Sequence, residues 1–374
     1  MKLIKGAPSW TFASSNVRAA LTQDAGHLGP VSFKLGSRWV SPFHVAPWHS
    51  EKVSPETPML LRRLRGDFFC APFGGNEKVY RGEQHPAHGE TAHSRWQSPK
   101  LIQANGVTHL EASLKTRVRP GIVRKQIELR NKETIIYQRH IMEGYSGLMS
   151  PGHHANLYFP DGEGTGRISI SKFIRGQVLP MEFEKASLGG YSILKQGALF
   201  KDLHKVPRMD GGLADLSTYP ARSGYEDLIM LSTDPKLKLG WTAAVFLKEK
   251  YVWFALKDPR VLASTVFWMS NGGRHYVPWN GRHRNVIGLE EVTSYFHCGL
   301  AESVAPNPVS KAGIPTALRL DPKKPLVINY IMGVAAVPAG FEEVADIVPV
   351  KNGVNLISTG KHKVFAPVRL DFLW

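Results

Sequence analysis

Cysteine is scarce in this sequence, which argues against two kinds of scaffold. Cys70 and Cys298 are the only cysteines among 374 residues. Two cysteines cannot build a disulfide framework, and their separation does not match the spacing of a metal site. A single bridge between them remains an alternative if the fold brings them together. Free cysteines are, however, commonly buried and reduced.

Long apolar runs are also missing. No stretch of about 18 consecutive apolar residues occurs, so a transmembrane helix is not expected. The first residues, MKLIKGAPSWTF, carry two lysines but no sustained apolar segment of the kind found in secretory signals. The sequence therefore predicts a cytoplasmic protein without a membrane partner.

Acidic residues are outnumbered by basic ones. The chain has 47 Lys and Arg against 31 Asp and Glu, which gives a net charge of +16. The excess is dispersed, and no basic tail, zinc-finger spacing or RNA-binding signature accompanies it. A dispersed positive surface is typical of solubility or of weak attraction to anions. We therefore expect no nucleic-acid partner, and an anionic substrate remains open.

Helical patterns are rare, being confined to 258–265 and 340–348. Elsewhere, segments rich in β-branched and aromatic residues alternate apolar with polar positions, as strands do; they include 107–120, 123–143, 167–173, 225–233, 241–256 and 325–334. No linker or visible repeat divides the chain. The pattern predicts an all-β protein with one antiparallel sandwich domain over residues 1–374, with a barrel or propeller as alternatives.

Three short segments combine titratable side chains with glycine, aromatic or apolar neighbours. They are HGETAHSRW at 88–96, SPGHHANLYFP at 150–160 and NVIGLEEVTS at 285–294. Imidazoles titrate near neutral pH, and a carboxylate in an apolar setting can act as a general base. Together the segments indicate acid–base chemistry.

The two histidine segments differ in local structure. Gly89 beside His88 allows a backbone or a ligand to approach closely, and His93 lacks the usual metal-ligand spacing relative to His88. His153 and His154 follow a Pro-Gly turn and precede an apolar strand. Neighbouring strand residues face opposite ways, so one can line a pocket while the other points away. Each histidine could also be a hydrogen-bonded structural residue.

Carboxylates appear in two strand-like settings. Glu290 and Glu291 follow an apolar run, and alternation sends them to opposite faces, so one can project into a cleft with a raised pKa. Both could equally be solvated strand residues. Glu226 and Asp227, in SGYEDLIML, open an apolar strand, where a carboxylate can bind vicinal sugar hydroxyls or cap a turn.

Other residues could complete a ligand site. The segment RGDFFCAPFGGN at 65–76 has the pattern of an apolar strand ending in a Gly-Gly turn, where Asn76 could hydrogen-bond a polar ligand. Trp96, Trp268 and Trp279 could stack on the apolar face of a sugar ring, although tryptophan is also a common core residue.

In their order along the chain, these segments resemble the aldose 1-epimerase family of galactose mutarotase-like proteins. The family's His-Gly motif followed by tryptophan corresponds to His88-Gly89 and Trp96. Its S-x-G-x-H-P-A-F-N-L-P turn corresponds to SPGHHANLYFP, which assigns the catalytic histidine to His154 rather than His153.

The resemblance continues through two later segments. GYEDLIML corresponds to the segment that carries the family's sugar-binding aspartate, and Leu289-Glu290 corresponds to its leucine–glutamate pair. The similarity covers roughly residues 60–300. It implies a large antiparallel β-supersandwich with the site in a concave cleft.

Two positions depart from the family pattern. The aspartate position is Glu226, which is one methylene longer. The arginine that follows the Pro-Phe turn is missing, and PFGGNEKVY offers Asn76 instead, with Arg81 as a displaced candidate. Both changes concern substrate binding and not proton transfer, so the implied reaction could persist while the sugar differs. The candidate substrate-binding residues are His88, Glu226, Asn76, Arg81 and, by stacking, Trp268.

The resemblance also implies a reaction, the interconversion of sugar anomers. Glu290 would take the proton of the anomeric hydroxyl, while His154 would protonate the ring oxygen so that the C1–O5 bond breaks. Rotation about C1–C2 and ring closure then yield the other anomer. No metal or organic cofactor is implied. A non-catalytic carbohydrate-binding protein, and a polysaccharide lyase or hydrolase on a similar sandwich, are the alternatives, and the sequence does not indicate an oligomeric state.

Overall fold

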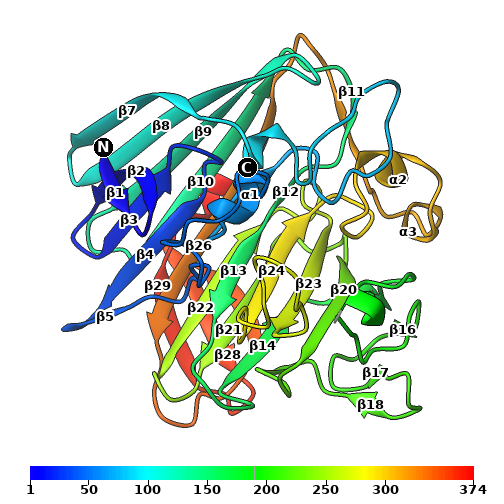
Figure 1. Ribbon diagram of the computed structural model, residues 1–374. Helices are drawn as coiled ribbons and strands as arrows, with labels where there is room; N and C mark the ends of the chain where they lie inside the picture. The colour runs from blue at the N-terminus through cyan, green and yellow to red at the C-terminus, as the bar shows by residue number, and fades with distance from the viewer. Residues whose placement is uncertain (189) are drawn as a thin grey trace.

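The computed structural model describes residues 1–188 and 190–374, which are organised mainly as antiparallel sheets (Figure 1). In both large sheets every ladder between named strands is antiparallel. The prediction of an all-β antiparallel sandwich is therefore confirmed.

The larger central sheet has nine strands. In spatial order they are β19 (Thr218–Tyr219), β14 (Gly166–Ile170), β21 (Gly240–Phe246), β22 (Tyr251–Lys257), β26 (Leu326–Ala336), β10 (Ile135–Glu143), β9 (Gly121–Arg130), β8 (Val107–Thr116) and β7 (Gln97–Ala104). Most of the segments predicted as strands belong to this sheet. Buried and half-buried positions alternate along most of β8 and β9, whereas β21 and β22 are buried along their whole length.

The second central sheet has eight strands and carries the candidate site. In spatial order they are β16 (Leu199–Phe200), β15 (Phe173–Val178), β20 (Tyr225–Thr233), β23 (Ser264–Asn271), β24 (Val286–Val292), β12 (Gly152–His153) and β6 (Phe69–Cys70), with β13 (Ala155–Tyr158) also pairing with β24.

Smaller sheets and short helices flank the two central ones. The N-terminal sheet contains β1 (Lys2–Ile4), β2 (Ala7–Ala13), β3 (Val17–Thr22), β4 (Leu28–Leu35) and β5 (Arg38–Val40), and a C-terminal sheet contains β27 (Val344–Val350), β28 (Gly353–Ser358) and β29 (Lys363–Pro367). Two strand pairs are β11 (Gly147–Met149) with β25 (Leu318–Leu320) and β17 (Val206–Pro207) with β18 (Leu213–Ala214).

The helices are α1 (Met59–Arg62), α2 (Leu300–Val304) and α3 (Pro308–Lys311), and the 3₁₀ turns are η1 (Glu90–Ala92), η2 (Ala186–Leu188) and η3 (Leu370–Leu373). None of the described helices is both long and apolar enough to span a bilayer.

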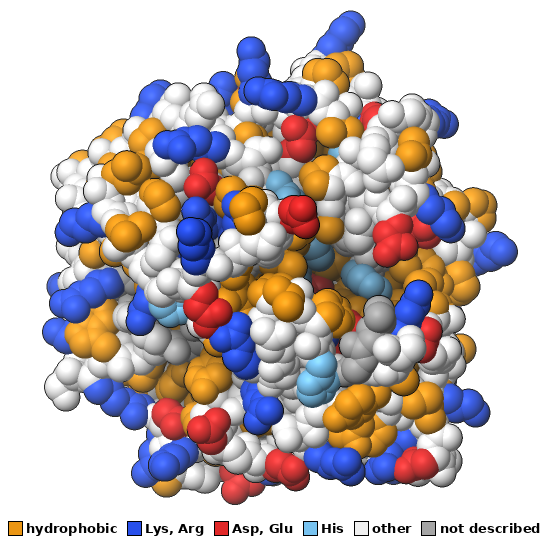
Figure 2. Space-filling model, viewed as in Figure 1, with side chains coloured by type: hydrophobic (Ala, Val, Ile, Leu, Met, Phe, Trp, Pro, Cys, Tyr) orange, Lys and Arg blue, Asp and Glu red, His pale blue; other side chains and the backbone are white. Residues whose placement is uncertain are grey.

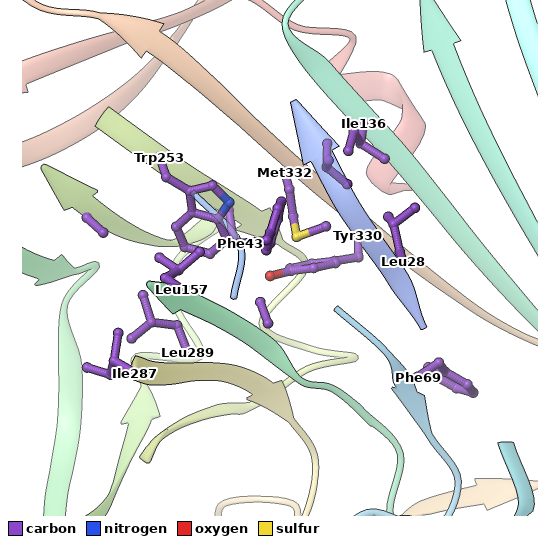
Figure 3. Close-up of a cluster of buried hydrophobic side chains, with 14 of the residues drawn as sticks. Leu28, Phe43, Phe69, Ile136, Leu157, Trp253, Ile287, Leu289, Tyr330 and Met332 are labelled. Carbon is purple, nitrogen blue, oxygen red and sulfur yellow. The ribbon is translucent and has the colours of Figure 1, made fainter. Parts of the chain in front are cut away.

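The two large sheets pack face to face over an apolar core. Ile287 and Leu289 of β24 and Leu157 of β13 meet Trp253 of β22 and Met332 of β26, and all five side chains are fully buried (Figure 3). Because side chains alternate along a strand, the residues between them on β24 point away from this core. The outer face of the eight-stranded sheet is thus left to form a site.

Both predicted helices are wrong. The segment 258–265 makes a single turn, in which the N–H of Leu262 donates to the carbonyl of Asp258, and β23 begins at Ser264. The segment 340–348 leads into β27, which pairs with β28. Within 340–348, Val344, Ile347 and Val348 pair with β28, and this pairing outweighs the local helical pattern. Within 258–265 only Ser264 and Thr265 pair with neighbouring strands, β20 and β24, and the residues before them form the turn that leads into β23.

Candidate active site

A cavity of about 280 Å³ opens on the outer face of the eight-stranded sheet. This volume lies near the lower end of the roughly 300–1,000 Å³ common for small-molecule sites, so it suits one small ligand. Figure 2 shows a hollow on the viewed face with hydrophobic and histidine side chains at its walls. The lining residues are Pro58, Leu60, Leu61, Leu64, Phe68, Ala87, His88, His154, Phe183, Leu228, Trp268, Arg274, Tyr276, Trp279, Glu290 and His297.

Three neighbouring strands form the floor of the cavity. Leu228 of β20 is the cross-strand partner of Trp268 of β23. Trp268 in turn pairs with Gly288 of β24, two residues before Glu290. Since residues two apart on a strand share a face, this register places all of these positions on the outer surface of the sheet.

His154 and Glu290 are in direct contact inside the cavity. Nε2 of His154 lies 3.1 Å from Oε1 of Glu290, and the two residues are only 5% and 2% exposed. The backbone N–H of His154 donates to the carbonyl of Phe68, whose ring stacks on the imidazole at 4.5 Å between centroids. The ring of Trp268 lies 5.6 Å away between centroids, nearly perpendicular to the imidazole. The imidazole is therefore held between aromatic rings with one nitrogen facing the carboxylate.

Burial governs the protonation of this pair. Removal from water raises the pKa of Glu290 well above its ordinary value, with Arg274 opposing the shift. Removal from water also lowers the pKa of His154 to about 3. Because burial disfavours both charged forms, it favours a protonated Glu290 beside an uncharged His154, and the pair shares that one proton. The 3.1 Å contact allows that proton to pass between the two groups.

His88 stands beside the pair in an unusual backbone conformation. Its φ is 59°, and left-handed backbone in a non-glycine residue is associated with functional sites. Its Nδ1 accepts a hydrogen bond from the N–H of Gly74, which assigns the proton of the neutral ring to Nε2. The ring lies 5.1 Å from that of His154. Gly89 has a different role, because a Cβ there would lie 2.1 Å from the carbonyl oxygen of Ala71.

The sequence neighbours of the pair point into the protein interior. Nδ1 of His153 lies 2.9 Å from Oδ2 of Asp67, and both residues are buried. Glu291 pairs with Lys257 and accepts a hydrogen bond from Thr242, both on the opposing nine-stranded sheet. Both neighbours are thus tied into the core, on the face opposite the cavity.

Glu226 lies behind the cavity wall and does not line it. Its Oε2 accepts a hydrogen bond from Nε1 of Trp268 at 3.0 Å, and its Oε1 accepts one from Oγ of Ser270 at 2.8 Å. Nε of Arg274 is 3.8 Å away. The residue is fully buried, and this burial raises its pKa to about 7. Its carboxylate orients Trp268 instead of facing the ligand space.

Asn76 and Arg81, which the sequence predicted as ligand-binding residues, are also not among the residues that line the cavity. Nδ2 of Asn76 donates to three backbone carbonyls of its own loop, and its Oδ1 accepts from the N–H of Leu300 at 2.9 Å. Arg81 is exposed, with its guanidinium 5.5 Å from the ring of Tyr80. The turn after the Gly-Gly pair uses its polar groups to hold itself together.

Several lining residues were not singled out from the sequence as ligand-binding. Arg274 belongs to the loop between β23 and β24, and its guanidinium lies 5.2 Å from Phe183, 5.2 Å from Trp268 and 4.7 Å from Trp279. Its Nε donates to Glu184. In the sequence Arg274 stands out only as part of a local basic cluster. The sequence feature that could have indicated a ligand site in this loop was Trp279, five residues after Arg274, which also lines the cavity.

Metal ligands are not grouped in this part of the molecule. Across residues 1–188 and 190–374, no three or more His, Cys, Asp or Glu side chains form a cluster that could hold an ion. Cys70 and Cys298 are both free thiols.

Comparison with solved structures connects this architecture to known proteins. A galactose mutarotase-like protein from Clostridium acetobutylicum aligns with a TM-score of 0.58 at 14% identity, covering 87% of this chain and 95% of that one. A galactose mutarotase related enzyme from Lactobacillus acidophilus aligns at 0.55 and 11% identity, covering 88% and 98%. An aldose epimerase homologue from C. elegans aligns at 0.54 and 11% identity, covering 88% and 100%.

The fold is that of the galactose mutarotase-like proteins. No protein-family model and no curated protein sequence matches the chain. The structural alignments establish a galactose mutarotase-like fold, but at sequence identities of 11% to 14% they establish nothing about activity. The function has to be argued from the site.

Proposed function

We propose that this protein is a carbohydrate isomerase that interconverts the α- and β-anomers of an aldose or sugar derivative. The contact that carries the proposal is the 3.1 Å approach of His154 Nε2 to Glu290 Oε1 inside a cavity of ligand size. Ring opening of a sugar needs a base at the anomeric hydroxyl and an acid at the ring oxygen. A buried imidazole–carboxylate pair that shares one proton provides both functions.

The reaction begins when the proton of the pair passes from Glu290 to His154 across their 3.1 Å contact, which leaves Glu290 ionised as the base and His154 protonated as the acid. Glu290 removes the proton of the anomeric hydroxyl, and the electron pair of the broken O–H bond forms the C1 carbonyl. The C1–O5 bond breaks, and O5 takes the proton of His154. Rotation about C1–C2 exposes the other carbonyl face, and the reverse transfers close the ring. The proton count of the pair is unchanged over the cycle, and acid–base assistance of this kind contributes about 100- to 10,000-fold in rate.

Two neighbours position the sugar for these transfers. His88 presents an Nε2–H that can donate to the oxygen atoms around the anomeric centre, since its Nδ1 accepts from Gly74. Trp268 presents its ring to the cavity, and its Nε1 is anchored on Glu226. An anchored indole suits stacking against the apolar C–H face of a pyranose.

The proposal is tested by following fresh α-anomers of several aldoses by polarimetry or NMR. We expect the wild type to accelerate anomerisation of at least one sugar, and Glu290→Gln to lose at least about 100-fold of that rate. Glu163→Gln, a change at an exposed glutamate, should leave the rate unchanged. Equal rates with and without protein, across neutral and acidic sugars, would refute the proposal. Sugar binding without acceleration would identify a carbohydrate-binding protein instead.

A further inference from the structure

Aliphatic and aromatic side chains form most of the cavity walls. Leu60, Leu61 and Leu64, from α1 and the residues after it, form one wall, and Leu228 contributes from β20. Aromatic rings form much of the remainder. Aliphatic side chains offer no hydrogen bond to a sugar hydroxyl, and a hydroxyl placed against them loses its contacts with water without replacement.

The side chains that could hydrogen-bond two adjacent sugar hydroxyls make their hydrogen bonds outside the cavity. Both carboxylate oxygens of Glu226 accept hydrogen bonds from Trp268 and Ser270 behind the wall. The amide of Asn76 is occupied by backbone groups. Beyond the reacting pair and His88, the lining contributes polar groups from Arg274, Tyr276 and His297, and the hydroxyl of Tyr276 already donates to Glu184. The leucine side of the cavity contributes none.

The charge at the cavity is close to balanced. Arg274 is the one Lys or Arg side chain among the lining residues that the structure describes. Its Nε donates to Glu184 and lies 3.8 Å from Glu226, so its charge is already offset. A phosphate or carboxylate would meet this paired cation together with Glu290. The terminal amino groups of Arg274 make no hydrogen bond to any described residue, which leaves them able to donate to a neutral oxygen.

We propose that the substrate is a neutral, monosaccharide-sized sugar in which one or more ring hydroxyls are missing or methylated, a deoxy or O-methyl sugar. This inference rests on the proposed function and specifies its substrate class. The leucine wall meets the deoxygenated or methylated positions, Arg274 donates to a remaining neutral oxygen, and the His154–Glu290 pair acts at the anomeric centre. The basic residues that give the chain its net charge lie outside this lining, apart from Arg274.

The first experiment compares matched sugars as substrates. The set contains D-glucose and D-galactose, their 2-, 3-, 4- and 6-deoxy forms, and glucose 6-phosphate and D-glucuronate as anions. Each rate is divided by the uncatalysed rate of the same sugar. We expect kcat/KM for at least one deoxy sugar to exceed that of its parent by roughly 10- to 100-fold, the discrimination that a hydrophobic pocket achieves. A parent hexose or an anion with the highest value would overturn the inference.

The second experiment separates binding from turnover. Methyl glycosides of the same sugars cannot open their rings, and their binding can be followed by the fluorescence of Trp268 and Trp279, which line the cavity. Tighter binding of deoxy glycosides without anomerisation of any sugar would refute the isomerase and support the substrate class. Anomerisation with a higher kcat/KM for the parent hexoses would support the isomerase and refute the substrate class. Binding of none of the glycosides, with no anomerisation, would refute both.

A matched pair of variants tests the leucine wall directly. Leu61 is half-buried and lines the cavity, whereas Leu199 is 57% exposed on β16. Leu61→Asn should lower the deoxy-to-parent ratio of kcat/KM at least about threefold, because its amide can pair with a hydroxyl. Leu199→Asn should leave the ratio unchanged. Thermal unfolding verifies that both variants are folded, and an unchanged ratio in folded Leu61→Asn would overturn the inference.

Discussion

A Cβ atom on Gly288 would lie only 2.4 Å from Oε1 of Glu290. The two residues share the outer face of β24, and the missing side chain of Gly288 leaves the space into which the carboxylate turns. That same oxygen is 3.1 Å from Nε2 of His154. The glycine therefore sets the position of the proposed base without touching the substrate itself.

Replacing Gly288 tests how closely activity depends on that position. Gly288→Ala should displace the carboxylate and lower kcat by about 100-fold, since a misplacement near 1 Å can have that effect. Gly360→Ala is the control, because the nearest atom to its new Cβ would be 3.5 Å away. Steady-state anomerisation kinetics provide the measurement. Wild-type kcat in Gly288→Ala would contradict the role assigned to the contact.

The adjacent histidines should respond oppositely to substitution. His154→Ala should abolish turnover while leaving sugar affinity and stability largely intact. His153→Ala should reduce the free energy of unfolding by about 3 kcal/mol, because it leaves the carboxylate of Asp67 buried without its imidazole partner. Urea unfolding and anomerisation rates distinguish the two. Loss of folding in His154→Ala would instead indicate a structural role for that residue.

The pH profile of kcat/KM should lack an acid limb at an ordinary histidine pKa. The active pair holds one proton, and burial lowers the pKa of His154 to about 3 while raising that of Glu290. A second proton therefore binds only in strong acid, and the single proton is lost only above the raised pKa of Glu290. We therefore expect kcat/KM not to fall as the pH is lowered through 6.5, the ordinary pKa of histidine, because the pKa of His154 lies at about 3. A fall centred near pH 6.5 would show that His154 titrates as an exposed imidazole.

Glu226 should make stability depend on pH. Burial raises its folded-state pKa to about 7, above the ordinary value of 4.5. The folded state thus holds this proton more tightly, and the stability it provides is complete below about pH 4.5 and is lost as pH rises through 7. Glu226→Gln removes that loss, so its free energy of unfolding relative to wild type should rise by roughly 3 kcal/mol between pH 4 and pH 8. A difference that does not vary with pH in urea unfolding would contradict the assigned titration.

Local pattern predicted the strands well and the helices badly. The segments that became β8, β9, β10, β20, β21, β22 and β26 alternate or concentrate apolar residues, and each found a partner strand. The segments 258–265 and 340–348 carried a helical pattern over a few residues only. Strand pairing, which is invisible in the local sequence, decided the conformation of the second segment, and the first became the turn that leads into β23.

The substrate-binding candidates show where motif position stops being informative. Asn76 occupies a plausible place in the chain, yet its amide is consumed by the backbone of its own turn. Arg274 had no motif to mark it, and it reaches the cavity because its loop joins the two strands that carry Trp268 and Glu290. The direction of a polar side chain depends on hydrogen-bond partners that are remote in sequence.

The sequence by itself determined which members of the paired residues share a face, because Cβ atoms alternate along any strand. That rule separates His154 from His153 and Glu290 from Glu291 before the neighbours of either strand are known. Only the tertiary structure decided which strands adjoin, and so which side chains meet. The pairing of β20, β23 and β24 turns Glu226 into a support for Trp268, and the packing of α1 over the sheet gives the cavity its leucine wall.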